Sequence, residues 1–432
     1  MKLRKISEQV IAITGATSGI GLTTARMAAN EGARLLLIAR NEEALRQLTD
    51  EINNRGGRAI YHAADVADEN ALRDAAQKAM KEFGRIDTWV NDAGSAIYGR
   101  VRDVPETDAR RLFDTNFWGV VNGSRAAVEC MQDRGGALIN VGSEVSDTPV
   151  PLLGIYAASK HAVKGFTDTL RMELESDNKP ISVTLIKPTA THTPFPENAK
   201  NFMPFEPKLP APVYAPELVA EAILYCAENP VRDFLVGDTA VVNSAMGRYM
   251  PRLHDKFMER TAESMQNSGE PSVINRRDGL HQSNSRLRER GSMDRFVMET
   301  SLYQQAKIHP MIAKALFLGG GMALAAMIGT RMTRNKQPMM GKKRFGEQGQ
   351  WKARGKFEDK QIREHMEVVG ADGGHVGTVD HVEGEQLKLT KTDPAAEGTH
   401  HRIPLNLVDS VSGDRVVLTK PAREAEAGRQ SA

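Results

Sequence analysis

Short, uninterrupted apolar runs alternate with longer amphipathic segments over roughly the first 240 residues of this 432-residue chain. Continuous apolar runs predict strands buried on both faces, as in a parallel sheet, because a strand with one wet face shows alternation instead. Regular strand–helix alternation implies right-handed crossovers, so we expect an α/β unit with a doubly wound parallel sheet. The expected strands are residues 10–14, 34–39, 58–61, 88–91, 137–141 and 182–186, and the expected helices include 21–30, 42–53, 69–83 and 156–175.

After residue 237 the alternation of apolar and amphipathic segments ends and the sequence becomes more polar. The chain is also longer than one hydrophobic core normally serves, so we expect more than one domain. Four short β-type runs with turn residues between them predict a small antiparallel domain over 361–420. The polar end is typical of a disordered tail. We therefore predict a first domain over 1–245, a polar linker over 246–306, an apolar helix over 307–332, a basic linker over 333–360, the β domain over 361–420 and a tail over 421–432.

The apolar stretch ALFLGGGMALAAMIGT, residues 315–330, is followed by a run of Arg and Lys residues. At about 1.5 Å per residue it is marginally long for a hydrocarbon core of about 30 Å. A glycine-rich helix buried against protein and a membrane contact through residues 308–330 both remain open. A full span would place the basic flank in the cytoplasm and the first domain outside, whereas an anchor within one leaflet avoids this conflict.

Composition excludes several classes of protein. A formal net charge of +2 is too small for a dedicated nucleic-acid binder. The two cysteines, Cys130 and Cys226, rule out a disulfide framework and fit a reducing compartment. The N-terminus has neither a long apolar stretch nor a cleavage site, so we expect a cytoplasmic protein, associated with the inner face of the membrane if the apolar stretch is an anchor.

The segment TGATSGIG, residues 14–21, follows the first expected strand and leads directly into a helix. Gly15 permits a tight turn, while Gly19 and Gly21 let the backbone approach a pyrophosphate and let the helix pack on the strand. The free N–H groups of a helix N-terminus favour that phosphate. The residues expected to hold a dinucleotide here are Gly15, Thr17, Ser18, Gly19, Ile20 and Gly21.

The second expected strand ends at Ala39, directly before Arg40. An enzyme that uses NAD usually has an acidic residue here that binds the ribose hydroxyls. Ala39 lacks that acid, and Arg40 offers a guanidinium to a 2′-phosphate, which favours NADP. The alternative is that Arg40 is a solvated residue at the start of a helix.

Further motifs follow the glycine turn in a fixed order: NDAG at 91–94, Asn116, Ser143, and YAASK at 156–160. Together with TGATSGIG they resemble the short-chain dehydrogenase/reductase family over roughly residues 8–240. The resemblance implies a Rossmann-like fold and a catalytic set of Asn116, Ser143, Tyr156 and Lys160.

The chemistry of the reaction explains this residue set. Hydride transfer to a carbonyl leaves an alkoxide that needs a proton, and the reverse reaction needs a base. Tyr156 does this poorly at the ordinary tyrosine pKa of about 10, but Lys160 one helical turn on favours the phenolate. Ser143 donates a hydrogen bond to the substrate oxygen. The resemblance also implies that Lys160 binds the nicotinamide ribose and that Asn116 holds a water linking Lys160 to solvent.

Other family positions are matched, with two departures. Asp92 stands where the family usually has a second Asn, and Thr189 stands near the nicotinamide where Gly is common. Phe195 begins a Pro-rich region in the position of the substrate lid, which is either an apolar lid against the substrate or generic loop packing. The remaining cofactor contacts that the resemblance implies are Asp65, Val66, Asn91, Ala93, Gly94, Tyr156, Lys160, Pro188, Thr191 and Thr193.

Five of the eleven histidines lie within 361–420, with carboxylates nearby. Their spacing is not that of a compact ligand set, so surface histidines are favoured over a metal site, and we expect no metal. Residues 364–420 resemble small bacterial domains of unknown function related to photosynthetic-reaction-centre-type β-barrels. This resemblance implies a fold and no activity.

These features predict an oxidoreductase that transfers a hydride between NADP(H) and a small carbonyl or alcohol substrate, with Tyr156 as proton donor or acceptor. The alternative is a sensor or scaffold protein that binds NADP without turnover. Ser143 and Tyr156 together favour the enzyme, because a non-catalytic binder needs neither. The family resemblance also suggests a homo-dimer or tetramer built on the long helices that begin near Asp108 and Gly154.

Overall fold

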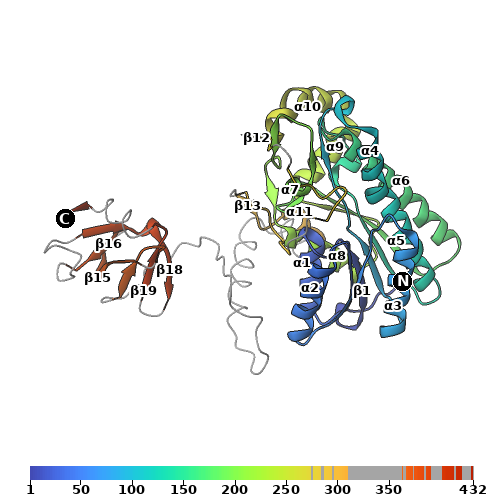
Figure 1. Cartoon of the computed structure of the whole chain (residues 1–432), viewed down its shortest axis with the longest axis horizontal. Coiled ribbons are helices and arrows are strands. Elements are labelled where there is room, and N and C mark those ends of the chain that lie inside the picture. Colours follow the sequence, from blue (N-terminus) through green and yellow to red (C-terminus); the bar gives the residue numbers. More distant parts are fainter. Residues whose placement is uncertain are drawn as a thin grey trace, which may run out of the picture. The chain divides into compact units, whose positions relative to one another are not determined.

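The computed structural model describes residues 1–273, 276–283, 287–293, 296–309, 362, 366–372, 374–383, 386–390, 401–412, 415–420 and 430–431. The chain forms two compact units, 1–340 and 341–432 (Figure 1). In the first unit, seven parallel strands form one sheet in the order β11-β7-β6-β4-β1-β2-β3. These strands are β1 (Val10–Thr14), β2 (Arg34–Ala39), β3 (Arg58–Ala63), β4 (Thr88–Asn91), β6 (Gly136–Val141), β7 (Ile181–Pro188) and β11 (Asp233–Val236).

Helices cover both faces of this sheet, as Figure 1 shows. Alternate residues of β1 face opposite sides: Ile11 and Ile13 pack with α1, α2 and α8, while Val10 and Ala12 pack with α3, α5 and α6. Burial on both faces is the reason why the strands read as continuous apolar runs. The helices are α1 (Gly19–Asn30), α2 (Glu42–Asn54), α3 (Glu69–Phe83), α4 (Glu106–Phe113), α5 (Gly119–Met131), α6 (Gly154–Ser176) and α8 (Pro216–Glu228).

The predicted doubly wound parallel sheet is confirmed. The expected strands 10–14, 34–39 and 88–91 agree with β1, β2 and β4, and the other three are each longer by one to three residues. The seventh strand, β11, was not expected from the sequence. It is four residues long and lies at the sheet edge, where a short, half-exposed strand lacks the continuous apolar run of the central ones.

Residues 246–306 differ from the polar linker that the sequence suggests. They continue α9 (Asp238–Tyr249) and form α10 (Pro251–Gln266), β12 (Asn267–Pro271), β13 (Val297–Met298) and α11 (Leu302–Ile308). β12 pairs with β9 (Phe205–Pro207) of the first unit. The buried positions of α10 are His254, Met258, Ala262 and Gln266, spaced four apart, so one narrow stripe packs although two of its members are polar.

The second unit contains a mixed sheet in the order β18-β19-β14-β15-β16-β17-β20. The expectation of a purely antiparallel domain is wrong in one respect, because β14 and β19 pair in parallel when the chain returns to the far side of β14. The last strand, β20, also pairs part of the expected tail with β17. The strands are β14 (Glu367–Val369), β15 (His375–Glu383), β16 (Gln386–Leu389), β17 (His401–Pro404), β18 (Val408–Ser412), β19 (Arg415–Leu418) and β20 (Gln430–Ser431).

Across the described part of the chain, no helix is both long enough and apolar enough to cross a bilayer. Of the expected apolar helix 307–332, only residues 307–309 are described, and the rest lies outside the described residues, as does the basic linker 333–360. Among the residues with a described placement, no group of three or more His, Cys, Asp or Glu side chains is arranged to hold a metal ion.

Candidate active site

The turn between β1 and α1 forms one wall of the site. Gly15 and Gly19 have φ values of +73° and +53°, which glycine adopts without steric cost. A Cβ at Gly21 would lie 2.5 Å from the carbonyl oxygen of Gly15, so a side chain there would prevent this close approach of helix and turn. These glycines therefore permit the close backbone approach that a pyrophosphate needs at the N-terminus of α1.

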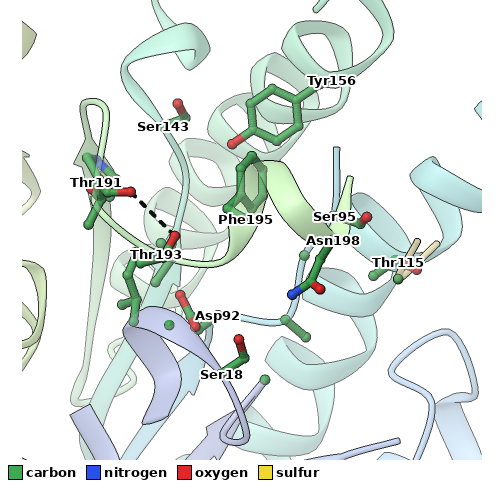
Figure 2. Close-up of a pocket in the computed structure, with 18 of the residues that line it drawn as sticks. Ser18, Asp92, Ser95, Thr115, Ser143, Tyr156, Thr191, Thr193, Phe195 and Asn198 are labelled. Carbon is green, nitrogen blue, oxygen red and sulfur yellow. Dashed lines mark hydrogen bonds between the residues drawn. The ribbon is translucent and has the colours of Figure 1, made fainter. Parts of the chain in front are cut away.

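A cavity of about 300 Å³ extends from this turn to the expected catalytic residues (Figure 2). Its wall is built at the carboxyl ends of β1, β2, β4, β6 and β7, where open α/β sheets bind ligands. Three expected site residues, Gly21, Asn91 and Asn116, do not line it. Those that do are Gly15, Thr17, Ser18, Gly19, Ile20, Arg40, Asp65, Val66, Ala93, Gly94, Ser143, Tyr156, Lys160, Pro188, Thr191, Thr193 and Phe195.

Tyr156 and Lys160 lie one turn apart on α6, and both are buried. The Lys160 ammonium donates a hydrogen bond of 2.8 Å to the carbonyl of Val141 and lies 5.9 Å from the centre of the Tyr156 ring. The Ser143 side chain lies near enough to the Tyr156 phenol to influence its pKa. Phe195 packs against the tyrosine with ring centres 5.5 Å apart, and Figure 2 shows Ser143 and Tyr156 at the opposite end of the pocket from Ser18.

Asn116 lies behind the cavity wall in a π-helical turn between α4 and α5. Such turns are frequent at functional sites. Its amide accepts from the backbone N–H of Ser95 at 2.9 Å and donates to the carbonyl of the same residue at 3.0 Å. A Cβ at Gly94 would lie 3.4 Å from Asn116 Oδ1 and 3.8 Å from Lys160 Nζ, so both side chains lie beside this glycine.

Burial governs the electrostatics of the site. It raises the pKa of the Tyr156 phenol above its ordinary value, and the nearby Ser143 side chain opposes this only in part. It lowers the pKa of Lys160 to about 8, which the negative charge of Asp92 partly offsets. Burial therefore keeps the Tyr156 phenol protonated at neutral pH. The expected effect of Lys160, to favour the phenolate, stays a prediction.

Asp92, the first departure from the family pattern, lines the cavity, whereas its neighbour Asn91 does not. Burial raises the pKa of Asp92, and the Lys160 charge and a hydrogen bond from the Gly21 N–H oppose that rise. The Asn91 side-chain oxygen instead accepts a hydrogen bond of 2.8 Å from the Trp89 indole N–H. Asn91 thus supports the ends of the strands and does not face the cavity. The sequence showed Asp92 as unusual but did not predict it as a site residue.

Thr189, the second departure, ties the loop after β7 to the catalytic segment. Its hydroxyl donates to the Glu144 carboxylate at 2.9 Å, and the other oxygen of Glu144 accepts from the Asn243 amide on α9 at 3.0 Å. Thr193 lies against Gly19: a Cβ added to Gly19 would be 3.1 Å from the Cβ of Thr193. The sequence did not predict Glu144, because nothing local signals its partner on α9.

Arg40 has partners that the sequence did not predict. Its guanidinium donates to the carbonyls of Leu280 at 3.1 Å, Gln282 at 3.4 Å and Gly279. These carbonyls belong to a segment that we call the strap, the described residues 276–283 and 287–293. In this structure the strap carbonyls take the place at Arg40 that the sequence assigns to a 2′-phosphate.

The strap also meets the glycine turn. The N–H of Gly19 donates to the carbonyl of Arg288 at 2.9 Å. Glu197 holds the strap at this point, because its carboxylate pairs with the Arg288 guanidinium and accepts from the Ser292 N–H at 2.6 Å. Two groups expected to bind phosphate oxygens therefore have strap carbonyls as partners.

The lid region over the Tyr156 end is largely apolar. It contributes α7 (Phe195–Asn198), β8 (Lys200–Asn201), β9 and β10 (Val213–Tyr214). Phe195 and Phe205 pack in a cluster with Tyr98, Leu153 and Leu280. A buried amide, Gln266 at the end of α10, also lines the cavity and was not expected from the sequence.

Comparisons with known proteins show the family of this chain. The family model described as short chain dehydrogenase matches residues 9–203. The uncharacterized oxidoreductase YxnA of Bacillus subtilis is 43% identical over 322 residues, which cover 74% of this chain and 90% of that protein. The chain belongs to the short-chain dehydrogenase family. This short-chain dehydrogenase also matches, over residues 362–426, a model described as an uncharacterized protein conserved in bacteria.

Relatives of lower identity match less than half of this short-chain dehydrogenase. Dehydrogenase/reductase SDR family member 7B of Bos taurus is 36% identical over 45% of this chain and 61% of that protein. The 3beta-hydroxysteroid dehydrogenase of Mediterraneibacter gnavus is 32% identical over 45% of this chain and 70% of that protein. A short chain dehydrogenase/reductase from Burkholderia phymatum, solved in complex with NAD, has the same fold, with a TM-score of 0.51, 22% identity and coverage of 63% and 100% of the two chains.

Proposed function

We propose that this protein is an oxidoreductase that transfers a hydride between NADP(H) and a small molecule with a carbonyl or hydroxyl group. The observation that carries the proposal is the convergence of Ser143, Tyr156 and Lys160 in one cavity with the glycine turn of β1 and α1. Family membership and the oxidoreductase relatives support the same reaction class.

In the proposed reaction, the bound nicotinamide supplies or accepts the hydride. The Tyr156 hydroxyl gives its proton to the carbonyl oxygen during reduction, because burial keeps this phenol protonated. Ser143 donates a hydrogen bond to the same oxygen. Lys160, with a pKa near 8, carries a positive charge at neutral pH that favours loss of the tyrosine proton. Asn116 lies on the Lys160 side, as a relay of protons to solvent requires.

NADP rather than NAD is proposed on the basis of Ala39 and Arg40. No carboxylate follows Ala39 to bind a ribose hydroxyl, and the half-buried Arg40 guanidinium faces the cavity. A 2′-phosphate would have to displace the strap carbonyls from Arg40. A charge-assisted contact with phosphate is stronger than one with a neutral carbonyl, which makes this exchange reasonable.

Oxidation of NADPH with a panel of ketones and aldehydes tests the proposal, with wild type, Tyr156→Phe and Tyr225→Phe compared. We expect turnover by wild type, a loss of at least about 100-fold in kcat for Tyr156→Phe, and unchanged NADPH binding. Tyr225 on α8 lies outside the cavity and serves as the matched control. Tight NADPH binding without turnover on any substrate would favour the NADP-binding sensor or scaffold instead.

Three further assignments remain predictions about the whole protein. They are a homo-dimer or tetramer, membrane contact through 308–330 at the cytoplasmic face, and a relation of the second unit to the photosynthetic-reaction-centre-type barrels. The small apolar core of that unit supports an independently folded domain. The site residues support a small-molecule partner and not a nucleic acid, because the cavity is small, about 300 Å³, and mostly apolar.

A further inference from the structure

Glu144 places a carboxyl group directly beside the catalytic serine. It follows Ser143, which Figure 2 shows at the Tyr156 end of the pocket, and it begins a short 3-10 turn, Glu144–Ser146. The residue lines the cavity and keeps part of its surface exposed. A charge on Glu144 raises the pKa of the Tyr156 phenol. The carboxyl group therefore lies near the place where we expect the reacting group of the substrate.

Among the described residues, three carboxyl groups line the cavity, and they differ in their partners. Asp65 forms an ion pair with Arg111, and the Lys160 charge favours the ionised form of Asp92. Glu144 forms no ion pair with a Lys, Arg or His side chain in the described part of the chain. Burial raises its pKa, and only hydrogen bonds from neutral groups oppose that rise. Glu144 therefore lacks the positive partner that a buried carboxylate normally has.

Two neutral donors hold the Glu144 carboxyl group in place. One oxygen accepts from the Thr189 hydroxyl at 2.9 Å, and the other accepts from the Asn243 amide at 3.0 Å. A carboxylate has about four acceptor positions, and these contacts use two of them. The group is thus fixed between the loop after β7 and α9, and it keeps acceptor capacity for a partner that enters the cavity.

The surroundings of Glu144 favour a positive charge as that partner. The Lys160 charge acts on Asp92 and does not compensate Glu144. A charge pair is screened less in an apolar wall than in water, so a bound cation would offset the cost of burying this carboxylate. The apolar side chains that pack around Tyr156 and line the cavity include Val145, Val150 and Leu153.

We propose that Glu144 binds a positively charged amino group of the substrate, close to the reacting carbonyl or hydroxyl. The substrate class is therefore an amino ketone or amino alcohol with an apolar skeleton. The inference rests on the proposed function, since it assumes that the reacting group lies at Ser143 and Tyr156. Glu144 determines specificity in this reading and takes no part in proton transfer.

Binding of a matched ligand pair tests the inference without turnover. The probes are an N,N-dimethylpiperidinium ion with a hydroxyl opposite the nitrogen and its carbon analogue, a dimethylcyclohexanol, which has the same shape and no charge. The full chain is saturated with NADPH, which cannot accept a hydride, and the two affinities are measured at about pH 8 by ligand-observed NMR titration. We expect wild type to bind the cation at least about tenfold more tightly, because close charge pairs in desolvated sites couple strongly.

Two variants assign that preference to the carboxylate. Glu144→Gln should bind both probes within about twofold of one another. Its amide can still accept from Asn243 and donate to the Thr189 hydroxyl, so the loop should stay in place. Glu31→Gln is the matched control, because burial also raises the pKa of Glu31, which lies outside this cavity. It should keep the wild-type preference.

The pH dependence of the preference gives a second test. The probe charge is permanent, so the preference of wild type should decline as the pH falls and Glu144 takes up a proton. Asp92, Lys160 and Tyr156 also titrate at this end of the cavity, and Glu144→Gln, which retains all three, should show no such decline. If that variant does not fold, Asp92→Asn still decides, because it should keep both the preference and its decline.

The outcomes separate this inference from the proposed function. Equal binding of the two probes by wild type, a preference that persists in Glu144→Gln, or its loss in Glu31→Gln or Asp92→Asn would overturn the role of Glu144. A cation preference in binding, with no NADPH oxidation on any carbonyl, amino ketones included, would overturn the proposed reaction while leaving the recognition site in place.

Discussion

Asp92 and Lys160 share the catalytic end of the cavity, and their charges depend on one another. Burial lowers the pKa of Lys160 to about 8, and the Asp92 carboxylate raises it. Asp92→Asn restores the residue usual in the family and removes that charge. The Lys160 pKa should then fall, so the ammonium is lost at lower pH and the alkaline decline in ketone reduction should move down by roughly half to one pH unit.

The measurement is kcat/KM for NADPH-dependent reduction between pH 6 and pH 10, on the order of ten points. Asp133→Asn, an exposed position outside the cavity, is the control and should leave the profile unchanged. An alkaline decline of Asp92→Asn that stays in place or moves to higher pH would contradict the coupling.

Gly21 and Gly165 are both helix glycines, but the first is crowded and the second has open space around it. A Cβ at Gly21 would meet the Gly15 carbonyl at 2.5 Å, whereas a Cβ at Gly165 on α6 would meet nothing within 4 Å. We expect Gly21→Ala to destabilise the fold by about 1–3 kcal/mol and to weaken NADP(H) binding, since the turn must open. Gly165→Ala should stabilise it by roughly 0.5–1 kcal/mol, because alanine loses less backbone entropy in a helix.

Urea unfolding and fluorescence titration with NADPH check this pair. If Gly21→Ala bound NADPH as tightly as wild type, the close approach of helix and turn would not be required for the cofactor.

Among the elements, the strap is hydrogen bonded to donor groups that a bound dinucleotide would need. Strap carbonyls and phosphate oxygens are all acceptors, so they compete for the Gly19 N–H and the Arg40 guanidinium. Glu197→Gln weakens the ion pair with Arg288 that holds the strap. The pair is partly exposed and so contributes modestly, and we expect the Kd for NADPH to fall by about threefold.

Limited proteolysis should cut within 276–293 faster in this variant. Glu43→Gln, which removes an exposed ion pair with Arg46 on α2, is the matched control and should change neither property. Faster proteolysis with weaker NADPH binding would show instead that the strap forms part of the cofactor site.

At the level of the whole molecule, the site lies within the first unit. Among the described residues, all those that line the cavity fall between Gly15 and Ser283. The α11 helix belongs to this unit as well, because Gln304 donates to the Leu218 carbonyl and Lys307 to the Asp233 carbonyl. A chain truncated after residue 309 should therefore keep the kcat/KM of the full chain within about twofold and unfold cooperatively.

The same two chains test the predicted membrane contact. We expect the full chain, but not the truncated one, to sediment with membranes, because residues 310–330 carry the apolar stretch. High salt distinguishes an apolar anchor from attraction through the basic flank. Equal partition of the two chains would contradict an anchor.

The parallel sheet and the catalytic end of the site were predictable because their signals are local. Strand and helix periods are set by neighbouring residues, and Tyr156 and Lys160 face one way because they are four apart on one helix. The glycine turn follows its strand directly, and strand ends in a parallel sheet meet at one edge. The sequence by itself therefore determined the fold class and the placing of the glycine turn, Tyr156 and Lys160 at the cavity.

Only the tertiary structure decided what closes the cavity. Arg40 meets Gly279 across 239 positions of sequence, and Gln266 meets Pro151 across 115. Glu144 likewise accepts a hydrogen bond from Asn243, which is 99 positions away in the sequence. The polar stretch after residue 245 carries a weak periodic signal because its buried stripe is narrow and partly polar. Its backbone carbonyls, which any residue supplies, leave no mark in the sequence, so their pairing with Arg40 and Gly19 followed from the packing alone.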